Sequence, residues 1–218
     1  MEQTETRHKI TEIFHSLQGE STLSGERFSF VRLTGCPLRC TYCDTTYSYT
    51  GGKWMTTSEV IAEVESHRTR WVCITGGEPL AHPNTIHLVQ ALRESAKKIT
   101  IETDGEEDVS RYVGLARLIM DIKTPGSGEK ADKCFENLRH LLPSDEIKFV
   151  LCDRADYEWS KKICADYALS ERFTVLFSPV FGSLALKDVA EWIISDRLNV
   201  RLQTQLHKQI WGAEVKGV

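Results

Sequence analysis

Short apolar runs that alternate with longer amphipathic segments restrict the fold of this chain more than any other feature of its sequence. The runs predict strands at 28–34, 71–75, 99–102, 118–122, 146–151, 173–177 and 199–203. The segments between them predict helices near 57–67, 84–96, 131–142, 155–168 and 186–195. Strands separated by helices form a parallel sheet with right-handed crossovers.

The length of the chain decides how far such a sheet can close. A complete eight-stranded barrel needs roughly 250 residues, and this chain has 218. We therefore predict an α/β fold, an open partial (β/α) barrel of about six parallel strands with flanking helices. Thr56 and Glu59 are placed to form a capping box on the first helix. No repeat, linker or low-complexity tract divides the sequence, so residues 1–218 are expected to form a single domain.

Charge and cysteine usage exclude several classes of protein. The net charge of -4 gives no basic footprint for nucleic acid. No apolar run approaches the roughly 20 residues that span a bilayer, and the first ten residues lack the apolar core of a signal peptide. An odd number of cysteines argues against a disulfide framework, and Cys73, Cys134, Cys152 and Cys164 are interpreted as structural. We expect a soluble, cytoplasmic protein without a membrane or nucleic-acid partner.

Polar and glycine-rich segments follow most of the predicted strands. They read GCPLRCTYCDTT, GGEP, TDG, KTPGSG and, near the end of the chain, QTQLHK. In barrels and open α/β sheets the chemistry gathers at the carboxyl ends of the strands. These segments are therefore expected to converge on one rim.

Cys36, Cys40 and Cys43 form a C-x3-C-x2-C clip in the first of these segments. Thiolates at such spacing are natural ligands of an iron–sulfur cluster or of zinc. A structural zinc site is closed by four ligands, and the loop contains no fourth cysteine or histidine. Three thiolates on a four-iron cluster would leave one iron open, as in a catalytic site. Zinc completed by a distant ligand such as His82 or His207 stays open, as do three incidental buried cysteines.

Several motifs resemble one known superfamily. The clip with Tyr42 before its last cysteine, followed one strand and helix later by GGEP at 76–79, resembles the radical S-adenosylmethionine enzymes. Leu17–Glu20, the Asp-Thr pair after the clip and the LHK…WG…GV segment at the end are similar to the 7-carboxy-7-deazaguanine synthases. This resemblance covers nearly the whole chain and is weaker between about 105 and 200.

The resemblance implies a lyase of queuosine or related deazapurine biosynthesis. Its substrate would be 6-carboxy-5,6,7,8-tetrahydropterin, whose ring contracts by a radical route to 7-carboxy-7-deazaguanine with loss of ammonia. The implied cofactors are a [4Fe-4S] cluster, S-adenosylmethionine and Mg²⁺. The implied partners are the small pterin, a flavodoxin-like or other electron donor, and a second copy of the chain in a homodimer.

The resemblance also assigns residues, with no catalytic group beyond the cluster and cofactor. The cluster is assigned to the three clip cysteines and Mg²⁺ to Thr45. S-adenosylmethionine is assigned to Tyr42, Gly76, Gly77, Glu78, Glu102, Thr103 and Lys123. The substrate is assigned to Leu17, Gln18, Gly19, Glu20, Arg32, Asp44, Thr75 and His207.

The position of Arg32 predicts, on physical grounds alone, that it has an anionic partner. By period-two alternation it shares a strand face with Phe28, Phe30 and Thr34. A buried guanidinium needs an anion, because an unpaired buried charge is costly. That anion is either a carboxylate of the protein or the carboxylate of a substrate held by the fork of the arginine.

The chain departs from the family pattern at two places. Ser178-Pro179 stands where many relatives have Gln-Pro, and ETDG at 102–105 replaces the commoner ETSG.

Two other functions stay open. One alternative is a glycyl-radical-enzyme activase, which shares the short clip but acts on a protein. The other is a non-catalytic zinc-binding module.

Overall fold

The computed structural model describes residues 5–130 and 132–218. The described strands form one nine-stranded sheet in the order β3-β1-β2-β4-β5-β6-β7-β8-β9. Their bounds are Arg7–Leu17 (β1), Arg27–Leu33 (β2), Lys53–Thr56 (β3), Trp71–Gly76 (β4), Lys98–Thr103 (β5), Arg117–Asp121 (β6), Glu146–Leu151 (β7), Thr174–Pro179 (β8) and Arg201–Leu202 (β9). From β2 through β9, without β3, neighbouring strands pair in parallel and in chain order. The predicted α/β class and open sheet are confirmed, but the sheet is mixed: seven of its described strands are parallel where about six were predicted, and β9 is shorter than the predicted strand at 199–203.

Two strands were not anticipated from the sequence. β1 pairs antiparallel with β2, with Phe14 opposite Phe30, and β3 pairs antiparallel with the other side of β1. Most residues of β1 are only half-buried, and polar residues such as Glu12 and His15 interrupt its apolar ones. A search for buried apolar runs overlooks such a strand, because an antiparallel strand near a sheet edge needs little apolar surface.

The helices span Thr57–Ser66 (α1), Thr85–Glu94 (α2), Cys134–Asn137 (α3), Arg154–Asp166 (α4), Leu169–Arg172 (α5), Leu186–Asp196 (α6) and Leu206–Trp211 (α7). Four of the five predicted helices are confirmed, the one at 131–142 is not, and α5 and α7 were not predicted. The capping box of α1 is present: the Thr56 hydroxyl accepts from the Glu59 amide at 3.2 Å, and the Glu59 carboxylate accepts from the Thr56 amide at 2.7 Å. This contact fixes the start of α1.

The prediction of a long helix at 131–142 was wrong. Residue 131 lies outside the described residues, and only the single turn of α3 is helical in the remainder. The side chain of Asn137, buried at the end of that turn, donates to the carbonyl oxygens of Gly105 and Glu107 and accepts from the amide of Val109. Asn137 thus ties the segment to a neighbouring loop. The apolar residues of the segment divide between the core and the surface, since Leu138 is buried and Leu142 is exposed.

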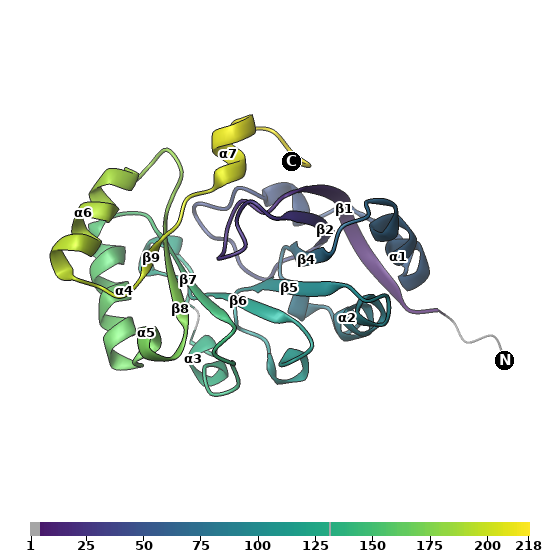
Figure 1. Cartoon of the computed structure of the whole chain (residues 1–218), viewed down its shortest axis with the longest axis horizontal. Coiled ribbons are helices and arrows are strands. Elements are labelled where there is room, and N and C mark those ends of the chain that lie inside the picture. The colour runs from purple at the N-terminus through teal and green to yellow at the C-terminus, as the bar shows by residue number, and fades with distance from the viewer. Residues whose placement is uncertain (1–4, 131) are drawn as a thin grey trace.

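The two faces of the sheet have different roles. Val31, Leu33, Val72 and Ile74 point to one face, where they join the main apolar core with the helices. In Figure 1, α1 to α6 lie along the outer side of the curved sheet, whereas α7 and the C-terminal end lie on the side where the curve is open. Cys73 faces the inner side and packs in a smaller cluster with two phenylalanines of β2.

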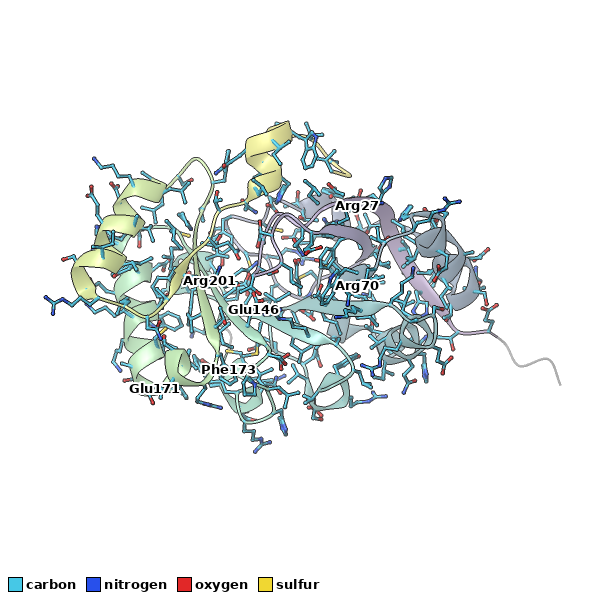
Figure 2. The ribbon with its side chains drawn as sticks, in the orientation of Figure 1. Arg27, Arg70, Glu146, Glu171, Phe173 and Arg201 are labelled. Carbon is cyan, nitrogen blue, oxygen red and sulfur yellow. The ribbon has the colours of Figure 1, made fainter. Side chains whose placement is uncertain are left out.

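The loop at 18–26, which joins β1 to β2, closes the amino-terminal end of the inner side. The Thr22 hydroxyl and amide donate to the buried carboxylate of Glu146 at the start of β7, and Arg117 pairs with that carboxylate at 2.6 Å. The amide of Ser21 donates to Gln203 at 2.7 Å. Figure 2 labels Glu146 together with Arg27 and Arg201, which stand at the amino ends of β2 and β9.

The cysteines outside the clip have structural surroundings. Cys73, Cys134 and Cys164 are buried, as predicted, and Cys152 is half-buried. Within the described residues, no helix is both long enough and apolar enough to cross a membrane.

Candidate active site

A cavity of about 540 Å³ lies on the inner side of the sheet. Every residue that the sequence assigned to the cluster, the cofactor, Mg²⁺ or the substrate lines this cavity, as does Ser178. The carboxyl ends of β2, β4, β5 and β6 supply part of the lining, which agrees with the expected rim. The loop at 18–26 and the segment around α7 supply the opposite part.

The clip lies in the loop after β2 and is held by backbone contacts. The amide and hydroxyl of Thr41 donate to the carbonyl oxygens of Ser127 (2.9 Å) and Gly126 (2.8 Å), in the turn that follows β6. The three clip thiols are half-buried, and burial raises the pKa of Cys36 to about 11. Among the described residues, no group of three or more His, Cys, Asp and Glu side chains is arranged to hold a single metal ion. The three thiols of the clip come from one loop and line the same cavity, and thiolates are the ligands that an iron–sulfur cluster takes.

The GGEP segment packs directly against the clip. The Glu78 amide donates to the carbonyl oxygen of Gly35 at 2.9 Å. A Cβ atom placed on Gly77 would lie 1.8 Å from that same oxygen, and one on Gly76 would lie 2.3 Å from the carbonyl oxygen of Leu33. Gly76 also has a φ of 137°, in the region that favours glycine. Both glycines are therefore needed to bring the GGEP segment against the loop that carries the clip.

Residues assigned to the cofactor are bonded to one another at the ends of β4 and β5. Glu78 is buried and accepts from the Thr103 hydroxyl at 2.8 Å and from the amide of Leu80 at 2.8 Å. Glu102 accepts from the Thr75 hydroxyl at 2.8 Å. These bonds fix the carboxylates at the cavity wall before any ligand binds.

Arg32 pairs with a carboxylate of the protein. Its Nε atom lies 2.7 Å from Glu12, a residue of β1, and the Tyr47 hydroxyl donates to the same carboxylate at 2.7 Å. The structural pair that the sequence left open is therefore present. It uses only Nε, and the structure gives the two Nη atoms no hydrogen bond to another described residue. Arg32 keeps donors for an anion in the cavity.

Four charged side chains form an alternating row across the cavity. Lys148 lies 3.0 Å from Glu20 and 3.3 Å from Asp121, and Asp121 lies 3.1 Å from Lys123. Burial alone would raise the pKa of Glu20 and of Asp121, but the neighbouring ammonium groups hold both below their usual range. The row connects the carboxylate assigned to the substrate with the lysine assigned to the cofactor.

The loop at 18–26 and the segment around α7 contact each other at the part of the cavity that the sequence assigned to the substrate. The amide of Leu206 donates to the carbonyl oxygen of Gly19 at 2.9 Å, and Gln205 donates to Glu20 at 2.9 Å. A Cβ atom on Gly19 would lie 2.0 Å from Nδ1 of His207. Gln18 is buried, and its side-chain NH₂ group has no hydrogen-bond partner among the described residues. The residue lines the cavity, and its buried donor lacks a partner there.

Asp44 and Thr45 lie side by side at the cavity rim. The Thr45 hydroxyl donates to one oxygen of Asp44 at 2.8 Å, which leaves its lone pairs available to a cation. The other oxygen of Asp44 binds the ammonium of Lys208 at 2.6 Å. Burial would raise the pKa of Asp44, but Lys208 holds it far below its usual range.

The sequence analysis missed several residues that line the cavity. Lys148 and Asp121 complete the charged row, and Tyr47, Tyr49 and Asp104 lie on the walls. A signal existed for the first two, because each is a charged residue inside a short apolar run, EIKFVL and LIMDI. Charges at such positions need partners or a function.

Removing the central lysine of the row tests its contribution to stability. We expect Lys148→Met to lower the free energy of unfolding by about 3 kcal/mol, because two mostly buried carboxylates lose their shared cation. Denaturant unfolding measures this change. The pKa values of Glu20 and Asp121 are lower in the folded protein than the ordinary carboxyl value of about 4. Their charges therefore stabilise the fold at pH values above about 4, and this stabilisation is lost as the pH falls through the lowered pKa values of the folded state. The difference from the unsubstituted protein should therefore shrink in acid.

Lys162→Met is the matched control. Lys162 is 70% exposed and pairs with Asp166 on the surface of α4, so its loss should change stability by less than about 0.5 kcal/mol. Equal effects of the two substitutions would contradict the role given to the row.

Comparisons with known proteins agree with this geometry. A model of the Radical SAM superfamily matches residues 30–128. The 7-carboxy-7-deazaguanine synthase of Koribacter versatilis is 41% identical over 96% of this chain and 100% of its own length. That of Chlorobaculum tepidum is 40% identical over 99% of each chain. The crystal structure of QueE from Escherichia coli has a TM-score of 0.73 at 23% identity, covering 92% of this chain and 95% of that one, and it supports the fold.

The sheet, the clip and the matched model define a protein of the radical S-adenosylmethionine superfamily. Within it, the chain belongs to the 7-carboxy-7-deazaguanine synthase family, because its relatives match it at this identity over nearly their full length. The resemblance stated from the sequence is confirmed. The comparisons do not favour the activase or the zinc-binding module.

Proposed function

We propose that this protein is a lyase that contracts the ring of 6-carboxy-5,6,7,8-tetrahydropterin to 7-carboxy-7-deazaguanine, on the route to queuosine and related deazapurines. The observation that carries the proposal is a single cavity that holds both the clip and a set of groups complementary to a carboxylated pterin. Substrate and product differ by one molecule of ammonia, so the reaction needs no net oxidant or reductant. The family membership supports the same assignment.

The donor set of the cavity fits the expected cofactors. Cys36, Cys40 and Cys43 would bind a [4Fe-4S] cluster and leave one iron for S-adenosylmethionine. Together the reduced cluster and S-adenosylmethionine would supply a radical able to remove a hydrogen atom from the carbon bearing the substrate carboxylate. Glu78 would accept from the ammonium of the cofactor, and Lys123 would pair with its carboxylate. Gly76, Gly77, Tyr42, Glu102 and Thr103 complete this side of the cavity.

The other side of the cavity fits the substrate. The free Nη donors of Arg32 would bind the pterin carboxylate, since a guanidinium fork matches a carboxylate in geometry and charge. The pterin edge carries N–H donors, which Glu20 would accept because neighbouring cations keep it ionised. The free NH₂ group of Gln18 would donate to the pterin carbonyl oxygen. Leu17, Gly19, Thr75 and His207 shape the surrounding wall.

We also propose that Mg²⁺ binds at Thr45 once substrate is present. Magnesium prefers oxygen ligands and keeps waters and substrate oxygens in its shell. The Thr45 hydroxyl has free lone pairs, and the ionised Asp44 beside it would accept from metal-bound water. Lys208 already balances the charge of Asp44, which disfavours a cation there before a second anion, the substrate carboxylate, arrives.

The cellular location, the electron donor and the oligomeric state are part of the same proposal. Seven cysteines, three of them on the clip, suit the reducing cytoplasm, where thiols stay reduced. An electron donor of the flavodoxin type would reduce the cluster. We expect residues 1–218 to act as one catalytic domain within a homodimer.

The assay that tests the proposal uses protein reconstituted with iron and sulfide without oxygen. It is incubated with the carboxylated tetrahydropterin, S-adenosylmethionine, a reductant and Mg²⁺, and the product is identified by mass spectrometry. We expect 7-carboxy-7-deazaguanine and one ammonia per product. Cofactor cleavage that proceeds equally without the pterin would point to an activase, and bound zinc without sulfide would end the enzyme assignment.

A further inference from the structure

Tyr49 is a wall residue of the cavity to which the proposed function gives no contact with cofactor or substrate. It follows a short 3₁₀ turn at Thr46–Ser48 and is half-buried beside the clip. The amide of Gly35 donates to the carbonyl oxygen of Ser48 at 2.8 Å, which fixes this turn next to the residue that precedes Cys36. The segment after the clip therefore folds back against the loop that carries it.

The side chain of Tyr49 reaches the last cysteine of the clip. It hydrogen-bonds to the side chain of Cys43 and is also within electrostatic range of Cys36 and Cys40. A phenol keeps its proton at neutral pH, whereas a cysteine that binds iron does so as a thiolate. With Cys43 as a cluster ligand, the Tyr49 hydroxyl is therefore the donor and the sulfur is the acceptor.

Arg39 holds the Tyr49 ring in this place. Its guanidinium carbon lies 4.3 Å from the centroid of the ring, which is the geometry of a cation–π contact. Nη1 of the same guanidinium donates to the carbonyl oxygens of Cys36 at 2.7 Å and Leu38 at 2.6 Å, so Arg39 is itself fixed within the clip loop. The Tyr49 ring is thus held beside the clip by a contact that does not involve its hydroxyl.

A hydrogen-bond donor at a cluster thiolate changes the energy of reduction. One electron from the electron donor makes the cluster more negative by one charge, and that charge is shared with the sulfur atoms. A hydrogen bond to sulfur stabilises the more negative state, so it favours the reduced cluster and raises the reduction potential.

We propose that Tyr49 raises the reduction potential of the cluster through its hydrogen bond to Cys43. This inference rests on the proposed function, because it takes the cluster and its one-electron reduction from there. In this role Tyr49 contacts neither S-adenosylmethionine nor the pterin and acts through the cysteine alone. Its hydroxyl makes the cluster easier for the electron donor to reduce.

A redox titration of the reconstituted protein tests the proposal without any substrate. Electron paramagnetic resonance measures the amount of reduced cluster at a series of applied potentials. Tyr49→Phe keeps the ring and its contact with Arg39 and removes only the hydroxyl. At a fixed potential, we expect it to lower the ratio of reduced to oxidised cluster by about tenfold, a fall of about 59 mV for one electron. Iron and sulfide content should stay unchanged.

Tyr157→Phe is the matched control. Tyr157 also lies under an arginine, with the guanidinium carbon of Arg154 at 4.7 Å from its ring centroid, and its hydroxyl donates to Asp196 at 2.9 Å. It belongs to the apolar core and does not line the cavity. Loss of this hydroxyl should leave the ratio of reduced to oxidised cluster within about twofold of the unsubstituted protein.

Three results would overturn the proposal. In the first, Tyr49→Phe binds its full iron and sulfide and titrates at the potential of the unsubstituted protein. In the second, the two tyrosine variants lower the potential equally, which would reveal a general effect of a lost hydroxyl. In the third, Tyr49→Phe loses the cluster, which would show that the hydroxyl supports the clip and does not tune its potential.

A failure of the proposed function gives a different result. The Tyr49→Phe shift would then remain, while the pterin assay of the unsubstituted protein yields no product. Zinc without sulfide in the unsubstituted protein would overturn the proposed function and this inference together.

Discussion

Cys40→Ala is expected to remove the cluster and to reduce product formation below detection. Cys40 is one of three thiols that line the cavity from a single loop, and this loop is fixed by backbone bonds to the turn after β6. With two thiolates left, a four-iron cluster would have two open irons and would not persist. Iron and sulfide analysis after reconstitution measures the loss, and the pterin assay measures its consequence.

Cys164→Ala is the matched control for this substitution. Cys164 is buried in α4 as part of the apolar core. Its truncation should lower stability by about 1 kcal/mol and leave the iron and sulfide content unchanged. Full iron content in Cys40→Ala, or its loss in Cys164→Ala, would show that the clip is not the cluster site.

Glu20→Gln is expected to lower kcat/KM for the pterin by about 100-fold, which corresponds to about 2.7 kcal/mol. The substitution replaces an ionised acceptor by a neutral amide, while the pterin edge offers N–H donors that favour a carboxylate. It also leaves Lys148 with Asp121 as its only carboxylate partner in the row. Steady-state kinetics with reconstituted protein measures the effect, and iron content reports whether the cluster site survives.

Glu26→Gln makes the same chemical change in the same loop. Glu26 is exposed and does not line the cavity. Its kcat/KM should stay within twofold of the unsubstituted protein. Should both variants lose activity equally, the assignment of Glu20 to the pterin edge would be wrong, and a general effect on the loop would explain the loss.

The parallel sheet could be predicted from the sequence because its strands are buried. Runs such as WVCIT contain no charged residue, and the helices between them fix the crossovers. β1 escaped prediction because half-buried, mixed residues carry no such pattern. The predicted helix at 131–142 failed because Asn137 binds a loop around 105–109, a tertiary contact that periodicity does not contain.

The sequence predicted which residues line the site, but it did not predict the side-chain contacts between them. The clip and GGEP were found because each is a local motif, and their contact follows from parallel strands ending at one edge. The bond between Glu20 and Lys148 joins residues 128 positions apart, across a loop that enters from the amino-terminal end of the sheet. Nothing in the spacing of either residue indicates that contact. The pair between Arg32 and Glu12 was missed for the same reason, since it depends on β1.

The central claim is that one cavity holds the cluster, S-adenosylmethionine and the pterin. A crystal structure tests it most directly, with crystals of the reconstituted protein grown without oxygen in the presence of S-adenosylmethionine and the pterin. The account predicts iron at Cys36, Cys40 and Cys43, the pterin carboxylate on Arg32, and the pterin edge on Glu20. An iron site elsewhere, or a pterin bound outside this cavity, would contradict it.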